Sequence, residues 1–482
     1  MKNTLTQQPK GLFLLFFVEM WERFSFYGMK GLLIYFMTQH FLYEENFAYD
    51  ILGAYGALVY AGPVFGGYLA EKFLGYKNSI IIGGIVMMLG HFAMFFLEEN
   101  SFFAALAMVA IGNGFFKPNI SSTVGQLYGE NDSRRDTGFY IFYLGINLGA
   151  FGQLLCAALG ENLGWHYGFS LAGIGMGLGL LIFMIRQKKD LNGIGEAPKI
   201  TKKISGISYF QLVLIGCLMA IPLYMFLLKH KDLLDQFVLY PIAALSIVYL
   251  VWEGWKRTKV DRQRMAAAVI LTFFSVIFWA FFEQAGSSIS LFIKKCLDRN
   301  VFGYEIVPSA FQSVNPGYII IFAPMMSIFW SFLDSKNLKI SIPVKFALGM
   351  LMLGVGFGIF AISYNSADAN GIAPLYFFML GYLVLTLGEL CLSPIGLSMI
   401  TQLAPKGLTG MMMGLWMLSS SFAHSVGAVI AKTTSMDESV TGLPALKVYT
   451  EVFSYIGWTA IGAGVILFLI SPLLQKWISS KD

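Results

Sequence analysis

Long apolar segments recur along the whole of this 482-residue chain. The runs at 80–97, 169–185 and 346–362 each approach the roughly 20 residues that a helix needs to cross the hydrocarbon of a bilayer. Charged residues make up 13% of the chain, against roughly 25% in an average soluble domain. The sequence lacks the short alternating segments of about 10 residues that are typical of a membrane β-barrel. It therefore predicts an all-α integral membrane protein.

The apolar runs predict fourteen spans and one orientation in the membrane. When the N-terminus is placed in the cytoplasm, most of the 33 Lys and Arg residues fall on the cytoplasmic side, as the positive-inside rule requires. We therefore expect a multi-pass protein of the cytoplasmic (inner) membrane with both termini in the cytoplasm. The net charge of +5 follows from this topology and does not indicate a nucleic-acid partner. The expected spans are approximately 12–42, 50–71, 79–97, 102–127, 138–160, 167–186, 208–228, 234–255, 265–293, 312–333, 343–364, 374–400, 408–431 and 448–474.

Similar short segments occupy matching places in two halves of the chain. Residues 137–139 (Thr-Gly-Phe) and 409–411 (Thr-Gly-Met) each open a span, and Lys117-Pro118 and Ser393-Pro394 each interrupt one. Parallel repeats of six spans would give this pattern, with a binding site at their interface near the bilayer midplane. The two spans within 208–255 have no counterpart. We expect an N-terminal six-helix bundle in 1–190, a linker with two inserted helices in 191–262, and a C-terminal six-helix bundle in 263–482.

Charged side chains gather on one face of the first span. On a helix, Glu19 and the residues 3, 4, 7, 8 and 11 positions after it fall within an arc of about 140°. A charge at the centre of a span costs roughly 2.5–3.5 kcal/mol, so this face must border a polar cavity. Glu22 and Arg23 could instead only hold two helices together, but a single pair would be enough for that. The residues of this face are Glu19, Glu22, Arg23, Phe26, Tyr27 and Lys30.

The segment 67–77 (Gly-Tyr-Leu-Ala-Glu-Lys-Phe-Leu-Gly-Tyr-Lys) resembles the cytoplasmic loop motif of the major facilitator superfamily. Its glycines permit a tight turn, and Glu71 can pair with Lys72 or Lys77 or cap a neighbouring helix. The resemblance implies the major facilitator fold, with two six-helix bundles and here a two-helix insert. It also implies a gating role for this loop.

Four further segments resemble motifs of the proton-dependent oligopeptide transporter family, and they occur in that family's order. Residues 19–28 (Glu-Met-Trp-Glu-Arg-Phe-Ser-Phe-Tyr-Gly) resemble its E-x-x-E-R-F-x-Y-Y-G signature. Residues 139–149 resemble its motif in the fifth span, 278–284 its F-W-A-x-x-(D/E)-Q segment, and 389–398 its E-x-x-x-S-P-I-G-x-S segment. The resemblance covers nearly the whole chain, including the two-helix insert of bacterial members. This chain departs from the first motif at Phe26, and it has Lys30 where the family usually has Arg.

The resemblance implies a proton-coupled symporter, not an enzyme, that imports di- and tripeptides and peptide-like drugs by alternating access. Protons are the coupling ion, and no other cofactor, no metal and no obligatory protein partner are expected. The chain contains none of the common hydrolase or zinc-peptidase motifs.

The implied peptide site is shared between the two halves. A short peptide is a zwitterion, so it needs an anion at its amino end and cations at its carboxylate once it leaves water. Glu389, Asn147 and Asn315 are expected at the amino end, and Lys30 and Lys117 at the carboxylate. Asn147 could instead form a hydrogen bond between helices. The other residues implied at this site are Tyr27, Tyr60, Tyr143, Trp279, Ser393 and Trp416.

Carboxylates, rather than histidines, are expected to carry the coupling proton. The candidates are Glu22, Glu283 and Glu19. We expect Lys117 to pair with Glu283 or Glu22 in different states, so that protonation releases the pair and the halves rock, while Arg23 stays charged. The histidine that animal members carry in the second span is not matched, and no histidine occupies a motif position. The histidines expected to have no function are His40, His91, His166, His230 and His424.

Other functions stay open at the level of the residues. One is symport or export of another organic ion, such as nitrate, an amino acid or a drug-like cation. Another is a receptor or scaffold that has lost transport, but a scaffold need not keep five costly intramembrane charges. Those five are Glu22, Arg23, Lys117, Glu283 and Glu389.

Overall fold

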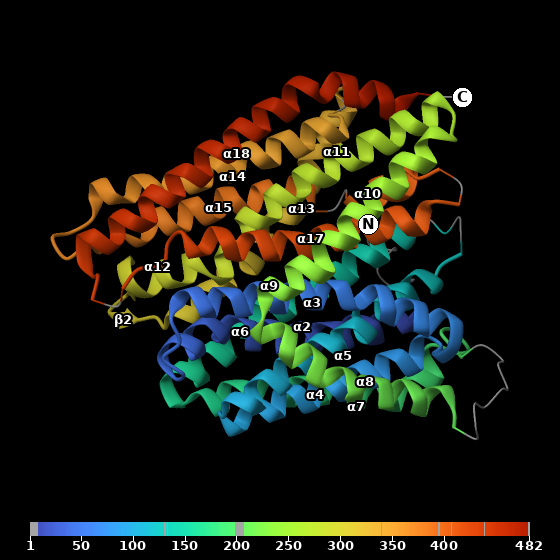
Figure 1. The fold of residues 1–482 in the computed structure, drawn as a ribbon, viewed down its shortest axis with the longest axis horizontal. Helices are drawn as coiled ribbons and strands as arrows, with labels where there is room; N and C mark the ends of the chain where they lie inside the picture. Colours follow the sequence, from blue (N-terminus) through green and yellow to red (C-terminus); the bar gives the residue numbers. More distant parts are fainter. Residues whose placement is uncertain are drawn as a thin grey trace. The chain divides into compact units, whose positions relative to one another are not determined.

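The computed structural model describes residues 8–129, 132, 134–197, 207–338, 340–393, 396–405, 407–437 and 439–480 (Figure 1). Almost all of these residues are helical. The first eight long helices are α2 (Lys10–Gln39), α3 (Glu45–Leu69), α4 (Tyr76–Ala93), α5 (Glu99–Gln126), α6 (Arg135–Leu163), α7 (Trp165–Asp190), α8 (Tyr209–Lys229) and α10 (Tyr240–Trp255). The remaining long helices are α11 (Lys259–Phe282), α13 (Val314–Ser335), α14 (Ile342–Ile362), α15 (Leu375–Leu392), α17 (Thr409–Lys432) and α18 (Gly442–Ser479).

Shorter elements complete the described chain. The short α-helices are α9 (Lys231–Leu234), α12 (Ser288–Cys296) and α16 (Gly396–Leu403). Short π or 3-10 segments are η1 (Ala70–Leu74), η2 (Met94–Phe96), η3 (Asp235–Leu239), η4 (Glu283–Gly286), η5 (Pro308–Ser313) and η6 (Ser363–Ser366). Strands β1 (Asn300–Val301) and β2 (Tyr304–Glu305) form an antiparallel hairpin that pairs Asn300 with Glu305.

The predicted all-α membrane fold is confirmed. Among the described residues, twelve helices are long and apolar enough to cross a membrane by length and composition. Two further long helices, α2 and α3, correspond to the first two expected spans. Helix α2 lies outside the twelve because of its charged residues. Helix α3 lies outside them because its many Gly and Tyr residues make it less apolar. The lengths of these long helices differ widely, from 16 residues in α10 to 38 in α18.

Contacts between Cα atoms divide the chain into two compact units. The first comprises Met1–Leu42, Leu58–His230 and Ser309–Gly317, and the second Tyr43–Ala57, Lys231–Pro308 and Tyr318–Asp482. The two inserted helices therefore belong to different units: α8 packs on α5 in the first, and α10 packs on α11 and α17 in the second. The domain limits at 190 and 262 stay predictions.

In the first unit, the segment 67–77 forms a turn, and residues 195 and 196, which follow α7, pack against it. The chain leaves α3 through the π turn η1, and Gly75 has a φ of 73°, a left-handed conformation that favours glycine. The partner of Lys77 is Glu196, with Nζ 2.5 Å from Oε1, and not Glu71, whose pairing with Lys77 was one of the roles that the sequence left open. The backbone N–H of Lys77 also donates to the carbonyl of Gly195. Residues after α7 thus hold this turn in place.

Close approach of helices depends on glycine in both units. In the first unit, a Cβ added to Gly149 of α6 would lie 2.1 Å from the carbonyl oxygen of Met20 in α2. In the second unit, α14 lies alongside α15 and α18 (Figure 1), and a Cβ at Gly354 would lie 2.7 Å from the carbonyl oxygen of Gly457. Lipid tails offer little hydrophobic drive for helix association, so small residues that allow tight packing supply much of the stability.

Gly149→Ala should destabilise the protein, because the new methyl group must push α6 away from backbone atoms of α2. We expect a loss of about 1–3 kcal/mol, measured as a lower melting temperature of the purified protein in detergent. Gly462→Ala in α18 is the matched control, since a Cβ there meets nothing within 4 Å. Equal melting temperatures for the two variants would show that the α2–α6 contact is not tight.

Candidate functional site

The charged face of α2 forms a compact buried cluster in the first unit. Arg23 Nε bonds Glu22 Oε2, and Arg23 Nη2 bonds Glu22 Oε1 at 2.5 Å. Arg23 Nε also lies 3.4 Å from Glu19 Oε1. All three residues are at most 1% exposed. A two-pronged contact to a carboxylate is the geometry that a guanidinium is best suited to make.

Asn113 of α5 adds a third contact to the Glu22 carboxylate, with Nδ2 3.3 Å from Oε1. Glu19 differs from Glu22, because neither of its oxygens accepts a hydrogen bond from a described residue. A buried carboxylate is stabilised in its ionised form by donors. Within this cluster, Glu19 is therefore the carboxylate whose charge has the weaker support.

Aromatic rings cover the Arg23 guanidinium. Its Cζ lies 5.0 Å from the ring centre of Phe26 and 5.8 Å from that of Tyr27, within the range of a cation–π contact. Phe26 is 5% exposed. The replacement of the family's usual Tyr by Phe26 therefore keeps the ring against Arg23, and the missing hydroxyl does not affect that contact.

Two lysines bring further positive charge to the same unit. Lys117 of α5 interacts electrostatically with Glu19, Glu22, Arg23 and Lys30. These groups are three cations against two carboxylates, so the cluster carries an excess positive charge when all are ionised. Such a cluster suits a carboxylate ligand. The predicted pairing of Lys117 with Glu283, which belongs to the second unit, stays a prediction.

Residues 139–149, which resemble the family's motif in the fifth span, contribute both to helix packing and to the polar groups of this unit. Gly145 and Gly149 lie against α2, where a Cβ on Gly145 would be 2.8 Å from the ring of Phe16. Asn147 is 5% exposed, and its Nδ2 donates within its own helix to the carbonyl of Tyr143 at 2.9 Å. Asn315 belongs to the first unit and Glu389 to the second, so the predicted grouping of these residues at the amino end stays a prediction.

In the second unit, the motif 278–284 ends helix α11. Glu283 follows the last residue of α11, where the helix changes to the 3-10 turn η4. Gln284 donates from Nε2 to the carbonyl of Gly427 in α17 at 2.9 Å, and it accepts from Ser288 Oγ at 2.7 Å. The ring of Trp279 packs edge-on against Phe282, with centres 5.4 Å apart. The motif thus fixes the position of Glu283 relative to α17.

Sequence reasoning missed His424 of α17. Its Nε2 lies 3.6 Å from Glu283 Oε1, and the two side chains are 8% and 20% exposed. We expected His424 to have no function, because it occupies no motif position. The available signal was the polar run Ser419, Ser420, Ser421, His424 and Ser425 within an otherwise apolar span.

The remaining predicted residues of the second unit lie on α15, directly after it, and on α17. Glu389 is 8% exposed, and Tyr382 of the same helix interacts electrostatically with both Glu389 and Glu283. The indole of Trp416 lies against Gly396, where a Cβ would be 2.0 Å from Cζ2. The backbone N–H of Ser393 caps α15 by donating to the Glu389 carbonyl at 2.8 Å.

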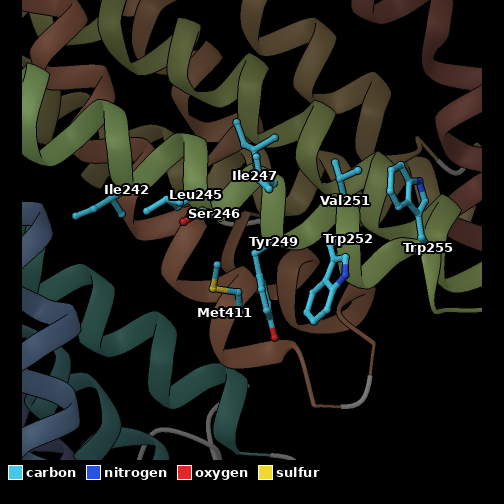
Figure 2. A pocket seen from close by; sticks show the side chains of 10 residues that line it. Ile242, Leu245, Ser246, Ile247, Tyr249, Val251, Trp252, Trp255 and Met411 are labelled. Atoms are coloured by element: carbon cyan, nitrogen blue, oxygen red, sulfur yellow. The ribbon is translucent and has the colours of Figure 1, made fainter.

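A separate apolar hollow of about 890 Å³ is lined by α10 and by Met411 of α17 (Figure 2). Figure 2 shows Tyr249, Trp252 and Trp255 among its side chains. Among the described residues that line it, none is charged. A zwitterion would lose its hydration there without compensation, so this hollow is not a candidate for the peptide site.

Long apolar helices that enclose compensated charges define the class of the protein. It is a multi-pass membrane protein.

Comparison with known proteins places the chain more closely. A family model described as the POT family matches residues 77–452, and the chain belongs to this family. The uncharacterized transporter YclF of Bacillus subtilis (strain 168) is 34% identical over 97% of this chain and 94% of its own length. Dipeptide and tripeptide permease B of Xenorhabdus bovienii (strain SS-2004) is 34% identical over 98% of this chain and 97% of its own length.

Solved structures agree in fold over nearly the full length. A mutant of a peptide transporter POT in complex with alafosfalin has a TM-score of 0.83 and 34% identity, and covers 98% of this chain and 96% of that chain. A POT family transporter in complex with 5-aminolevulinic acid has a TM-score of 0.82 and 31% identity, and covers 97% of both chains. The predicted major facilitator type of fold is therefore confirmed.

Arg23→Met should destabilise the protein strongly, because it leaves Glu19 and Glu22 buried without their cation. Breaking a buried pair in this way costs about 3–5 kcal/mol. The measurement is the melting temperature in detergent, with Lys447→Met as the control. Lys447 also pairs four residues along its helix, with Glu451, but the two side chains are 62% and 58% exposed, so we expect a loss below about 1 kcal/mol. A similar loss in both variants would refute a special role for the buried pair.

Proposed function

We propose that the protein is a proton-coupled symporter that imports di- and tripeptides across the cytoplasmic membrane by alternating access. Peptide-like drugs are further substrates. Protons are the coupling ion, no other cofactor takes part, and both termini lie in the cytoplasm. Permease names among the relatives and ligand-bound structures of the family support this substrate class.

The observation that carries the proposal is a division of charge between the units. The first unit holds an excess of cations around Lys30 and Lys117, and the second holds the buried carboxylate Glu389. A peptide zwitterion matches both, because its two ends need opposite charges once it is dehydrated. Nitrate or a simple cation would match only one of them.

Each end of the peptide then has its own partners. Lys30 and Lys117 hold the carboxylate, and Glu389 with Asn147 and Asn315 holds the ammonium. Aromatic side chains and one serine lie around the peptide side chains, which vary from one substrate to the next. These residues are Tyr27, Tyr60, Tyr143, Trp279, Trp416 and Ser393.

Coupling uses the carboxylates that can lose their charge. Glu19 is held by the ion pair with Arg23 but accepts no hydrogen bond from a described residue, so a proton can neutralise it at low cost. Glu22 keeps the two-pronged bond to Arg23 and stays ionised. Lys117 is the mobile cation that pairs with these carboxylates in one state and with Glu283 in another. Protonation shifts Lys117 between partners, and the gradient thereby drives import.

Uptake by purified protein in proteoliposomes tests this function. With an inward proton gradient, wild type should concentrate dipeptides and tripeptides but not free amino acids or nitrate. Glu389→Gln should weaken peptide binding by about 2–5 kcal/mol, because the ammonium loses its charged partner. Calorimetry with one dipeptide, used for both wild type and Glu389→Gln, provides the two affinities. Accumulation of amino acids alone would favour a symporter of amino acids instead of peptides. No accumulation of any solute would favour a scaffold.

Glu19→Gln should separate coupling from substrate exchange, because it mimics the protonated carboxylate. Gradient-driven accumulation should fall at least about tenfold, while counterflow without a gradient persists. Glu22→Gln is the matched comparison on the same helix face, and it should impair both assays because Arg23 loses its bidentate partner. Undiminished accumulation by Glu19→Gln would place the coupling proton elsewhere.

A further inference from the structure

A second buried polar cluster lies in the second unit, around one turn of α17. His424 faces Glu283, and the next residue, Ser425, donates from Oγ to Asp235 Oδ1 at 2.7 Å. Asp235 Oδ2 in turn lies 2.5 Å from Lys231 Nζ. Lys231 and Asp235 are each 4% exposed and come from α9 and η3, at the start of the second inserted helix. The insert therefore holds the turn of α17 that carries His424.

The imidazole of His424 occupies a space that glycine leaves open. A Cβ on Gly56 of α3 would lie 2.3 Å from Cγ of His424. One turn earlier, a Cβ on Gly53 would lie 2.5 Å from Cβ of Ala428 and 3.1 Å from Cε of Lys231. Any larger residue at either position would displace α17. The ring is thus held against both α3 and the end of α11.

The contact between His424 and Glu283 has the length of an ion pair rather than that of a hydrogen bond. At 3.6 Å, Nε2 and Oε1 are beyond the 2.7–3.2 Å that is usual for N–H···O. A neutral ring gains little at this separation, whereas an imidazolium and a carboxylate attract each other strongly where water is scarce. The contact between His424 and Glu283 therefore stabilises the protein most when the ring carries a proton.

The other charged groups around this turn have partners of their own. Asp235 pairs with Lys231, and Asp50 of α3 lies 2.6 Å from Lys432 at the end of α17. From α15, Tyr382 and Glu389 lie in electrostatic range of one another, and Tyr382 also interacts with Glu283. Glu283 is the carboxylate that faces the ring directly.

We propose that His424 is a second proton-binding group of the transport cycle and acts through Glu283. A proton from water binds Nε2, the ring becomes an imidazolium, and it pairs with the ionised Glu283 carboxylate. Return of that proton to water breaks the pair, and Glu283 then has the role that the proposed function gives it. Histidine suits this task because an imidazole exchanges protons between about pH 5 and 8. The consequence for transport rests on the proposed function, but the pairing itself does not.

The pairing can be tested on purified protein without transport. Melting temperatures of wild type, His424→Gln, Glu283→Gln and the double variant are compared at about pH 5.5 and pH 8. The ion pair exists when the ring is protonated, so its stabilisation is present at the lower pH and is lost as the pH rises. The gap between wild type and His424→Gln should be at least about twice as large at pH 5.5 as at pH 8. The double variant should melt close to either single variant at both pH values.

His230→Gln is the control for the loss of a histidine. His230 is exposed at the end of α8, where Nδ1 lies 2.8 Å from the carbonyl oxygen of Phe226. The difference in melting temperature between His230→Gln and wild type should be the same at both pH values. An equal gap for His424→Gln at both pH values would mean that the ring only fills space, and the proposal would be overturned.

Transport supplies the second readout. In proteoliposomes, His424→Gln should flatten the dependence of gradient-driven uptake on pH between about pH 5.5 and 8, while counterflow stays within about threefold of wild type. An unchanged pH profile would overturn a role in coupling even if the pair exists. Failure of wild type to accumulate any peptide would instead refute the proposed function, and the melting comparison would still decide the pairing.

Discussion

Compensation of charge inside the bilayer is the constraint on which the rest of this structure depends. Charged side chains away from water must find partners among the helices themselves. Arg23 meets this requirement for α2 through Glu22 and Glu19, and Lys231 meets it for Asp235 in the second unit. Because such groups are costly to bury, they also respond to small changes. A single added proton or ligand charge alters the balance by several kcal/mol.

Tight packing makes this compensation possible. The carboxylates and guanidinium of α2 are buried, and α6 approaches α2 closely beside them, at Gly149. In the second unit, glycines of α3 leave room for His424, and Gln284 ties α11 to α17. Small residues and polar side chains therefore act together: the first bring the helices close, and the second fix their rotation.

The sequence predicts the helices and the charged face of α2 well, because apolar runs and a 3.6-residue period are local properties. It does not predict pairings between distant segments. Glu71 is the nearest acidic residue to Lys77 in the sequence, yet the partner of Lys77 is Glu196, more than one hundred residues away. His424 looked isolated for the same reason, since its proximity to Glu283 depends on how α17 packs on α11. The assignment of α8 and α10 to different units likewise follows from tertiary contacts alone.

The unequal helix lengths have a consequence for the surrounding lipid. At about 1.5 Å per residue, the 38 residues of α18 rise about 57 Å, whereas the 18 residues of α15 rise about 27 Å, close to the hydrocarbon thickness of a bilayer. A long helix adapts to acyl chains of different length by tilting, but α15 has no length to spare. Glu389 lies near the C-terminal end of α15. We therefore expect bilayer thickness to act on the depth of this carboxylate.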